Sequence, residues 1–258
     1  GLFDNALISE NTQNIVRSLL DGQSASSDPD NEAYRYLIVS VCNAWHSSMP
    51  FLFERIADYT ELLMPDDLLS STSILARLRE AMTEENCQDV EVIGWLYQFY
   101  ISEKKDEVFE GLKKNQKVTP ENIPAATQLF TPNWIVRYLV ENSLGRLWML
   151  NNPNSNLIHK MEYYIAPQEP ETDFLKITSP EEIKVCDPAC GSGHMLTYSF
   201  DLLYAIYEEA GYDAVSIPTL IVKNNLYGIE LDQRAGELSA FALTMKARGK
   251  YKRFFRDP

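Results

Sequence analysis

The sequence has 258 residues, 45% of them hydrophobic, which is enough to form a buried core and excludes a chain that is disordered as a whole. Its 37 acidic and 23 basic side chains give a formal net charge of -14, so the overall basic charge of a typical nucleic-acid-binding domain is missing. The acidity is uneven, because residues 1–110 carry 20 acidic and 7 basic side chains whereas residues 111–258 carry 17 and 16.

The first 115 residues are predicted to form an all-helical N-terminal domain. Apolar side chains recur at helical spacing over residues 2–20, and Gly, Ser, Asp and Pro end that pattern. Further helical patterns, separated by helix breakers, cover residues 31–47, 51–63, 72–82, 89–102 and 104–114. The aromatic side chains could form a binding surface, but their helix-face spacing favours packing in a core.

A second domain is predicted over residues 116–258, after an extended, proline-marked segment at 117–124. Thr131 and Pro132 predict the start of a helix that runs to about Leu150, and a long polar connection follows. The remaining elements are predicted in the order strand 183–186, helix 192–210, helix 217–224, strand 227–229 and helix 232–248. This alternation is typical of an α/β fold with parallel strands.

The four cysteines show no spacing typical of a disulfide framework, which indicates a reducing, cytoplasmic compartment. The apolar runs are shorter than the roughly 18 to 20 residues of a membrane span. Cys186, Cys190 and His194 recur every four residues, but the second ligand pair of a structural zinc site is missing. We therefore expect neither a membrane anchor nor a metal.

The most informative stretch is the glycine-rich turn between the predicted strand at 183–186 and the following helix. Gly191 and Gly193 would let the backbone pass close to a ligand. Asp187, just before the turn, would repel the pyrophosphate of a dinucleotide and attract a cation. S-adenosylmethionine carries a sulfonium and an α-ammonium group and no phosphate, so the charge of this turn favours it over NAD.

A second acidic residue, Glu230, ends the next predicted strand, where its carboxylate could accept hydrogen bonds from both hydroxyls of a ribose. Ligand-free alternatives exist for each residue: a simple helix-entry turn for the two glycines, a capping role for Asp187 and a solvated strand end for Glu230. Their order along a strand, helix, strand pattern favours the cofactor interpretation.

Three segments in order resemble motifs of the amino-methyltransferases that act on adenine in DNA. Residues 187–194 (Asp-Pro-Ala-Cys-Gly-Ser-Gly-His) resemble their first motif, and residues 227–232 (Tyr-Gly-Ile-Glu-Leu-Asp) their second. Residues 126–136 resemble the Phe-Thr-Pro segment that precedes the first motif in the γ-type order. Residues 92–100 and 123–148 further resemble the adenine-specific methyltransferases of bacterial BREX phage-defence systems, the PglX type.

This resemblance covers nearly the whole chain and implies that residues 116–258 are the first part of a Rossmann-like, S-adenosylmethionine-dependent methyltransferase fold. It also implies a set of cofactor-binding residues. These are Phe130, Thr131 and Pro132 at the methionine, Asp187, Ala189, Gly191 and Gly193 around the methionine and ribose, Glu230 at the ribose hydroxyls, and Leu231 on the adenine ring.

One motif of the family is missing. Its Asn/Asp-Pro-Pro-Tyr/Phe motif holds the flipped adenine, and this sequence contains no Pro-Pro pair. The segment Asn152-Pro153-Asn154 lacks the second proline and the aromatic residue and is typical of a turn. We therefore expect the N-terminal part of a larger bacterial enzyme, truncated before the catalytic motif, with no catalytic residue of its own and weak cofactor affinity.

Partners follow from the same resemblance. Double-stranded DNA would be bound mostly by regions outside these residues, and other defence-system proteins are further candidate partners. The open edge of the small sheet should pair with a second copy or be covered by a local helix. Two alternatives remain open. One is a protein or small-molecule methyltransferase, which the Phe-Thr-Pro segment disfavours, and the other is a non-catalytic scaffold whose acidic helical region docks other proteins.

Overall fold

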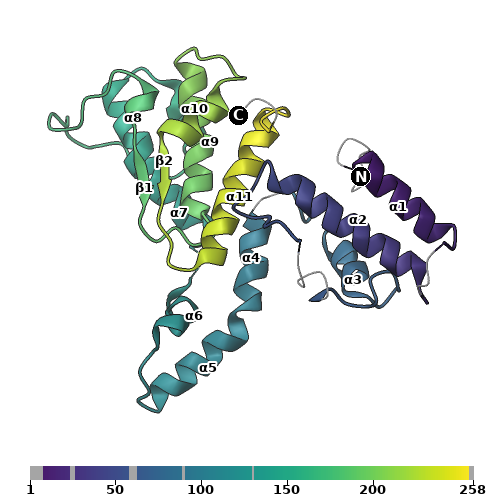
Figure 1. The fold of residues 1–258 in the computed structure, drawn as a ribbon. Coiled ribbons are helices and arrows are strands. Elements are labelled where there is room, and N and C mark those ends of the chain that lie inside the picture. Colours follow the sequence, from purple (N-terminus) through teal and green to yellow (C-terminus); the bar gives the residue numbers. More distant parts are fainter. Residues whose placement is uncertain (1–7, 24–26, 58–62, 89–90, 130, 256–258) are drawn as a thin grey trace. The chain divides into compact units, whose positions relative to one another are not determined.

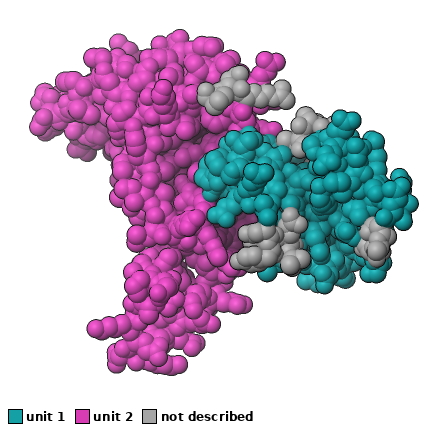
Figure 2. Space-filling view, viewed as in Figure 1, with its two compact units in different colours: residues 1–89 teal, residues 90–258 magenta. Residues whose placement is uncertain are grey.

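The computed structural model describes residues 8–23, 27–57, 63–88, 91–129 and 131–255. Two compact units make up the chain, residues 1–89 and residues 90–258 (Figure 2). Among the described residues, no helix is both long enough and apolar enough to cross a membrane.

The first unit contains helices α1 (Glu10–Leu20), α2 (Pro29–His46) and α3 (Ile74–Ala81). Each helix begins at a side chain that satisfies a backbone N–H of its first turn. Ser9 accepts from Thr12 and Asp28 from Asn31, both at 3.2 Å, and Ser73 does the same for α3. Helices α1 and α2 lie side by side (Figure 1).

The predicted helix at 51–63 is wrong for residues 51–57, which form turns and irregular backbone. The side chain of Asn43 on α2 donates to the Ile56 carbonyl at 2.8 Å and accepts from the Ile56 N–H at 2.7 Å. These bonds take the backbone groups that a helix would use. Residues 58–62 lie outside the described residues, and the all-helical arrangement of residues 1–115 is not confirmed.

The second unit begins earlier than the predicted boundary at 115/116. Helices α4 (Glu91–Tyr100) and α5 (Ser102–Lys113) belong to it, and α6 (Ile123–Thr127) follows. The physical reason is that α4 packs on α11 (Gln233–Lys250), at the other end of the unit's sequence. The assignment of functions to the two domains stays a prediction.

The predicted helix at 131–150 is present as a continuous stretch of three parts. Helix α7 (Asn133–Val140) passes into a π-helical turn (Glu141–Gly145) and then into α8 (Arg146–Asn151). The long polar connection that follows contains only short 3-10 turns, Asn156–Lys160 and Pro180–Glu182.

A small parallel sheet carries the site. Strand β1 (Val185–Asp187) pairs with β2 (Leu226–Gly228), with Asp187 opposite Gly228. Helices α9 (His194–Glu209) and α10 (Ile217–Asn224) lie between the strands in sequence, and α11 follows β2. The described part of the chain is thus mostly helical with a two-stranded parallel sheet, and a fuller Rossmann-like sheet is not confirmed.

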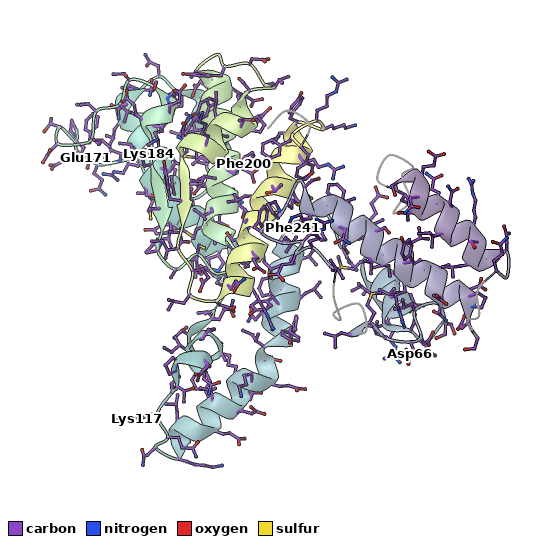
Figure 3. All side chains as sticks on the ribbon, in the orientation of Figure 1. Asp66, Lys117, Glu171, Lys184, Phe200 and Phe241 are labelled. Atoms are coloured by element: carbon purple, nitrogen blue, oxygen red, sulfur yellow. The ribbon has the colours of Figure 1, made fainter. Side chains whose placement is uncertain are left out.

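The core of the second unit gathers around α9. Phe200, labelled in Figure 3, has no exposed surface, and other side chains of α9 are equally buried. They pack against residues of α7, α8 and α10, among them Val136, Val140, Trp148, Ile217 and Ile221. The burial of these apolar side chains holds α9 in place. It thereby also holds the turn that precedes α9 against the sheet.

Candidate functional site

The turn between β1 and α9 requires glycine at two positions. Gly191 and Gly193 have φ values of +53° and +88°, in the left-handed region that favours glycine. A Cβ atom on Gly193 would also collide with the side chain of Ser239 on α11. The turn closes through a 2.8 Å bond from the Gly193 N–H to the Cys190 carbonyl.

Asp187 lies at the end of β1, as predicted, and its Oδ1 atom accepts a 3.1 Å hydrogen bond from the N–H of Ala189. This contact lies within the turn and is not the helix cap that the sequence left open as an alternative, because α9 begins at His194 and has no side-chain cap. The side chain is half-buried, so one carboxylate oxygen holds the turn while the group stays accessible to a ligand.

Glu230 connects the two turns that follow the strands. Its Oε2 atom accepts from the N–H of Gly191 at 2.6 Å, and its Oε1 atom accepts from Leu231 at 2.8 Å and Asp232 at 3.0 Å. The carboxylate is half-buried and accepts from three backbone donors, so it is not a free, solvated strand end.

A pocket of about 200 Å³ lies at this junction. Four of the predicted residues line it, namely Ala189, Gly191, Glu230 and Leu231. The opposite wall comes from α6 and the residues after it: Ile123, Pro124, Thr127, Gln128 and Leu129. The lining therefore combines apolar side chains with two carboxylates, Glu230 and Asp232, and the amide of Gln128, as ligand pockets commonly do.

Three side chains of this pocket have features of a binding surface. Leu231 is 83% exposed and Leu129 is 73% exposed, so both present apolar surface without a protein neighbour to cover it. The amide of Gln128 is buried at both its oxygen and its nitrogen, and neither atom has a hydrogen-bond partner in the part of the chain that the structure describes. A buried amide without a partner is costly, and a ligand would satisfy it.

The other predicted residues that the structure describes, Thr131, Pro132, Asp187 and Gly193, do not line this pocket. Thr131 and Pro132 directly precede α7, and the Thr131 carbonyl lies 3.5 Å from the Nδ1 atom of His194 at the start of α9. The Cα atom of Gly193 packs against the side chain of Ser239 on α11. Phe130 falls outside the described residues.

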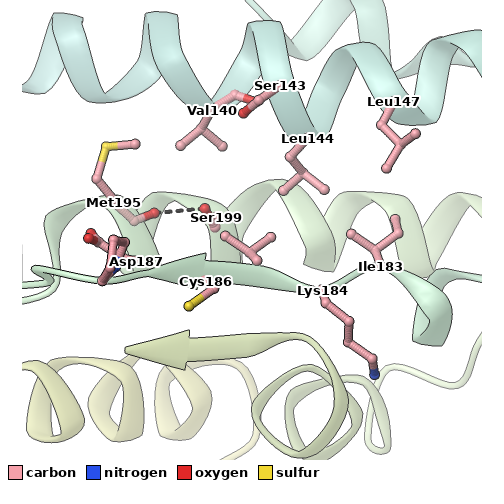
Figure 4. Close-up of a pocket in the computed structure, with 12 residues that line it drawn as sticks. Val140, Ser143, Leu144, Leu147, Ile183, Lys184, Cys186, Asp187, Met195 and Ser199 are labelled. Atoms are coloured by element: carbon pink, nitrogen blue, oxygen red, sulfur yellow. Dashed lines mark hydrogen bonds between the residues drawn. The ribbon is translucent and has the colours of Figure 1, made fainter. Parts of the chain in front are cut away.

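Asp187 faces a second, larger pocket of about 470 Å³. Figure 4 shows this pocket along the side of β1 that faces away from β2, with Val140, Leu144 and Leu147 of the α7–α8 stretch opposite the strand. A local helix thus lies across the open edge of the sheet with a cavity between them. Pairing of this edge with a second copy stays a prediction.

Seven residues that line the pocket were not among the predicted cofactor-binding residues: Ile123, Pro124, Thr127, Gln128, Leu129, Pro188 and Asp232. Two residues of α4 were not predicted either. Tyr97 binds the lining residue Asp232, and Gly94 lies against Ser192, the residue after Gly191. No local pattern could have revealed Tyr97, because its partner Asp232 is 135 residues away. Gln128 lies inside the segment that resembles the Phe-Thr-Pro motif, which is the one signal that could have drawn attention to it.

Comparisons with known proteins agree with the resemblance found in the sequence. Residues 174–254, which contain both strands and the glycine turn, match the DNA-methyltransferase domain family of MmeI. The chain is 51% identical over 251 residues to the adenine-specific methyltransferase BrxX of Escherichia coli O9:H4 (strain HS), which covers 94% of this chain. It is 37% identical over 259 residues, 93% of this chain, to the adenine-specific methyltransferase PglX of Lacticaseibacillus casei (strain Zhang).

A more distant match, 25% identical over 62% of the chain, is the putative type II restriction enzyme and methyltransferase RM.MjaORFECS2P of Methanocaldococcus jannaschii. The chain spans about a fifth of the length of the first two relatives, 20% of BrxX and 21% of PglX. The match to both extends over nearly all of its own residues, the helical first unit included. Over nearly all of its length, the chain is therefore similar to one part of the adenine-specific methyltransferases BrxX and PglX.

Proposed function

We propose that this chain binds S-adenosylmethionine and forms the cofactor-binding part of an enzyme that methylates the N6 amine of adenine in DNA, in bacterial phage defence or restriction-modification. The observation that carries the proposal is the junction of Glu230 with the Gly191 turn at the ends of two parallel strands. In open parallel sheets, ligands bind outside the carboxyl ends of the strands.

The residues present fit such a cofactor in their chemistry. Gly191 and Gly193 keep the turn free of side chains, so the backbone can approach a ligand closely. The carboxylates of Asp187 and Glu230 suit a ligand that carries positive charge and hydroxyl groups. Gln128 offers a donor and an acceptor that lack a protein partner among the described residues.

The pocket is small for a whole molecule of the proposed cofactor. About 200 Å³ is less than the roughly 300 to 1,000 Å³ of pockets that enclose a whole ligand of this kind. The pocket would therefore hold one part of the cofactor, or open when the cofactor binds. This agrees with the expectation that the described residues alone bind it weakly.

Each residue has a separate task in the proposed site. Glu230 would accept the ribose hydroxyls, Leu231 would pack on the adenine ring, and Asp187 with Ala189 would lie by the methionine. Phe130, Thr131 and Pro132 would contact the methionine from the segment before α7. When bound, the cofactor supplies a methyl group that its sulfonium activates toward direct displacement, so the protein needs to position the groups rather than form a covalent intermediate.

This mechanism makes no use of a thiol of the chain. Burial raises the pKa of Cys190, the cysteine of the glycine turn, and the nearby carboxylates of Asp187 and Glu230 act in the same direction. Its thiol therefore stays protonated and is a poor nucleophile at neutral pH. The acceptors for the adenine amine would come from an Asn/Asp-Pro-Pro-Tyr/Phe motif elsewhere in a longer protein, as would most contacts to double-stranded DNA.

The proposal is tested with the full-length protein. We expect saturable binding of S-adenosylmethionine by calorimetry, and transfer of tritium from its labelled methyl group to adenine in duplex DNA. The 258 residues alone should bind more weakly and transfer no tritium. Label that appears in protein or small molecules, with none in DNA, would instead support a methyltransferase of another substrate class.

A further inference from the structure

Helix α4 contacts both turns that form the candidate cofactor pocket, although it lies outside the segments predicted to bind cofactor. It runs beside the N-terminal part of α11 (Figure 1). Its two contact residues, Gly94 and Tyr97, are three positions apart, so they lie on one face of the helix.

Gly94 brings the backbone of α4 against the glycine turn. A Cβ atom at this position would lie 2.5 Å from Ser192 Oγ and 3.0 Å from His194 Nε2. Ser192 is only 4% exposed and His194 only 6% exposed, so neither side chain has open space to move into. The ring of Trp95, the next residue of α4, lies 6.2 Å from the His194 ring, centre to centre.

Tyr97 holds the other turn. Its hydroxyl donates a hydrogen bond to the Oδ2 atom of Asp232, whose Oδ1 atom caps α11 by accepting from the Arg234 N–H at 3.1 Å. The N–H of Asp232 in turn donates to Glu230. Burial and the neighbouring carboxylate both raise the pKa of Tyr97, so the hydroxyl keeps its proton and remains a donor at neutral pH.

A continuous set of contacts therefore runs from α4 through Tyr97, Asp232 and Glu230 to Gly191, and returns to α4 through Ser192 and Gly94. Three members of this set, Gly191, Glu230 and Asp232, also line the pocket. A shift of α4 would change the separation of the two turns. Groups that bind a ligand need to be held within roughly 0.5 Å of their working positions.

We infer that Gly94 and Tyr97 are positioning residues for the cofactor: α4 fixes the distance between the glycine turn and the β2–α11 turn, and so sets the affinity of the pocket for S-adenosylmethionine. The inference rests on the proposed function. It assigns to a helix upstream of the methyltransferase motifs a part in cofactor binding, without direct contact to the cofactor.

The test compares two variants of the full-length protein that lose the same atom from the same helix. Tyr97→Phe removes the hydroxyl that holds Asp232. Tyr100→Phe is the matched control, because Tyr100 is 70% exposed and its hydroxyl only accepts a long, 3.4 Å bond from Arg234. Calorimetry gives the dissociation constant for S-adenosylmethionine, and tritium transfer to duplex DNA gives kcat and the two KM values.

We expect Tyr97→Phe to raise the dissociation constant and the KM for S-adenosylmethionine about tenfold, the effect of one lost hydrogen bond to a charged group. The kcat at saturating cofactor and the KM for DNA should stay within about twofold, and Tyr100→Phe should match the unmodified protein. A purely structural role would lower the melting temperature without this selective change in cofactor affinity.

Three results would count against the inference in distinguishable ways. If Tyr97→Phe and Tyr100→Phe bind the cofactor equally well, α4 does not position the turns. If Tyr97→Phe fails to fold, Gly94→Ala carries the same test through the Ser192 contact, and unchanged affinity there overturns the inference. If the unmodified protein binds no S-adenosylmethionine, the proposed function fails and the inference fails with it.

Discussion

The carboxylate of Glu230 accepts a 2.6 Å hydrogen bond from the backbone N–H of Gly191, and this bond joins two turns that are 39 residues apart in the sequence. A carboxylate can accept about four hydrogen bonds. Three of these positions are filled by backbone N–H groups, those of Gly191, Leu231 and Asp232. Two ribose hydroxyls would therefore have to share or displace at least one of these donors.

Replacement of this carboxylate is the most direct test of the site. Glu230→Ala should raise the dissociation constant for S-adenosylmethionine about 10- to 100-fold, since each hydrogen bond to a charged group contributes about 1.5 to 3 kcal/mol. Calorimetry on the full-length protein measures this dissociation constant. Glu208→Ala is the control, because Glu208 is exposed on α9 and its ion pair with Lys160 is long, at 3.9 Å. Equal affinity of the two variants would exclude Glu230 as a ligand of the cofactor.

The glycine turn offers a test of stability. Gly193 and Gly211 have nearly the same φ, +88° and +85°, but an added Cβ atom meets Ser239 at Gly193 and nothing within 4 Å at Gly211. Gly211→Ala should therefore lower the free energy of unfolding by about 1 kcal/mol through backbone strain alone. Gly193→Ala should lower it by about 3 kcal/mol, because the collision adds to the strain. Urea denaturation measures the free energy of unfolding of both variants. Equal losses would show that the turn at Gly193 accommodates the added Cβ atom without a further loss of stability.

The order of strands and helices from residue 183 onward could be predicted because each element has a local signal. The two glycines, the strand ends and the spacing of apolar residues on α9 are all visible within a few residues of sequence. Glu230 was predicted to end the second strand, and it lies two residues beyond β2, in the turn before α11. The cofactor roles of these residues stay a prediction, because they rest on the resemblance to a family.

The features that were missed depend on contacts between distant parts of the sequence. Residues 51–57 have a helical pattern, but Asn43 binds both backbone groups of Ile56 and holds this stretch in another conformation. Helix α4 has an ordinary amphipathic pattern, and contacts such as those of Gly94 and Tyr97 with distant residues reveal that it belongs to the second unit. Tertiary contacts override local preference at such places, and no local pattern of residues shows where these contacts form.

The buried carboxylate of Glu141 offers a test of the contacts that stabilise the α7–α8 stretch. Glu141 has no exposed surface, and it accepts hydrogen bonds from the Tyr198 hydroxyl at 2.6 Å and the Tyr163 N–H at 2.5 Å. Arg137 pairs with Glu141 at 3.4 Å and with the exposed Glu162 at 2.8 Å. Glu141→Ala should lower the free energy of unfolding by about 3 kcal/mol, because several buried polar groups lose their partner.

The matched control is Glu162→Ala, which removes the other carboxylate from the same Arg137. Its side chain is 63% exposed, so we expect a loss below about 1 kcal/mol. Chemical denaturation of both variants measures the loss in the free energy of unfolding for each. Similar losses would mean that burial does not set the strength of this network.

The same network predicts a loss of stability in alkali. Burial and the hydrogen bond to Glu141 raise the pKa of Tyr198 from 10.0 to about 12. The folded protein therefore keeps the Tyr198 proton at pH values where the unfolded chain releases it, so the native state binds more protons. The stabilisation is fully present below pH 10 and is lost as the pH rises from about 10 to about 12.

Tyr198→Phe should flatten the decrease of the unfolding free energy over this pH interval, in addition to lowering stability at neutral pH. The slope should not vanish, because burial also raises the pKa of Tyr207. Tyr138→Phe is the control, since it removes the same atom from a residue of α7 that is 41% exposed. Urea denaturation at intervals between pH 8 and pH 12 measures the profiles of all three proteins. Parallel profiles for Tyr198→Phe and the unmodified protein would show that Tyr198 ionises at its ordinary pKa in the folded state.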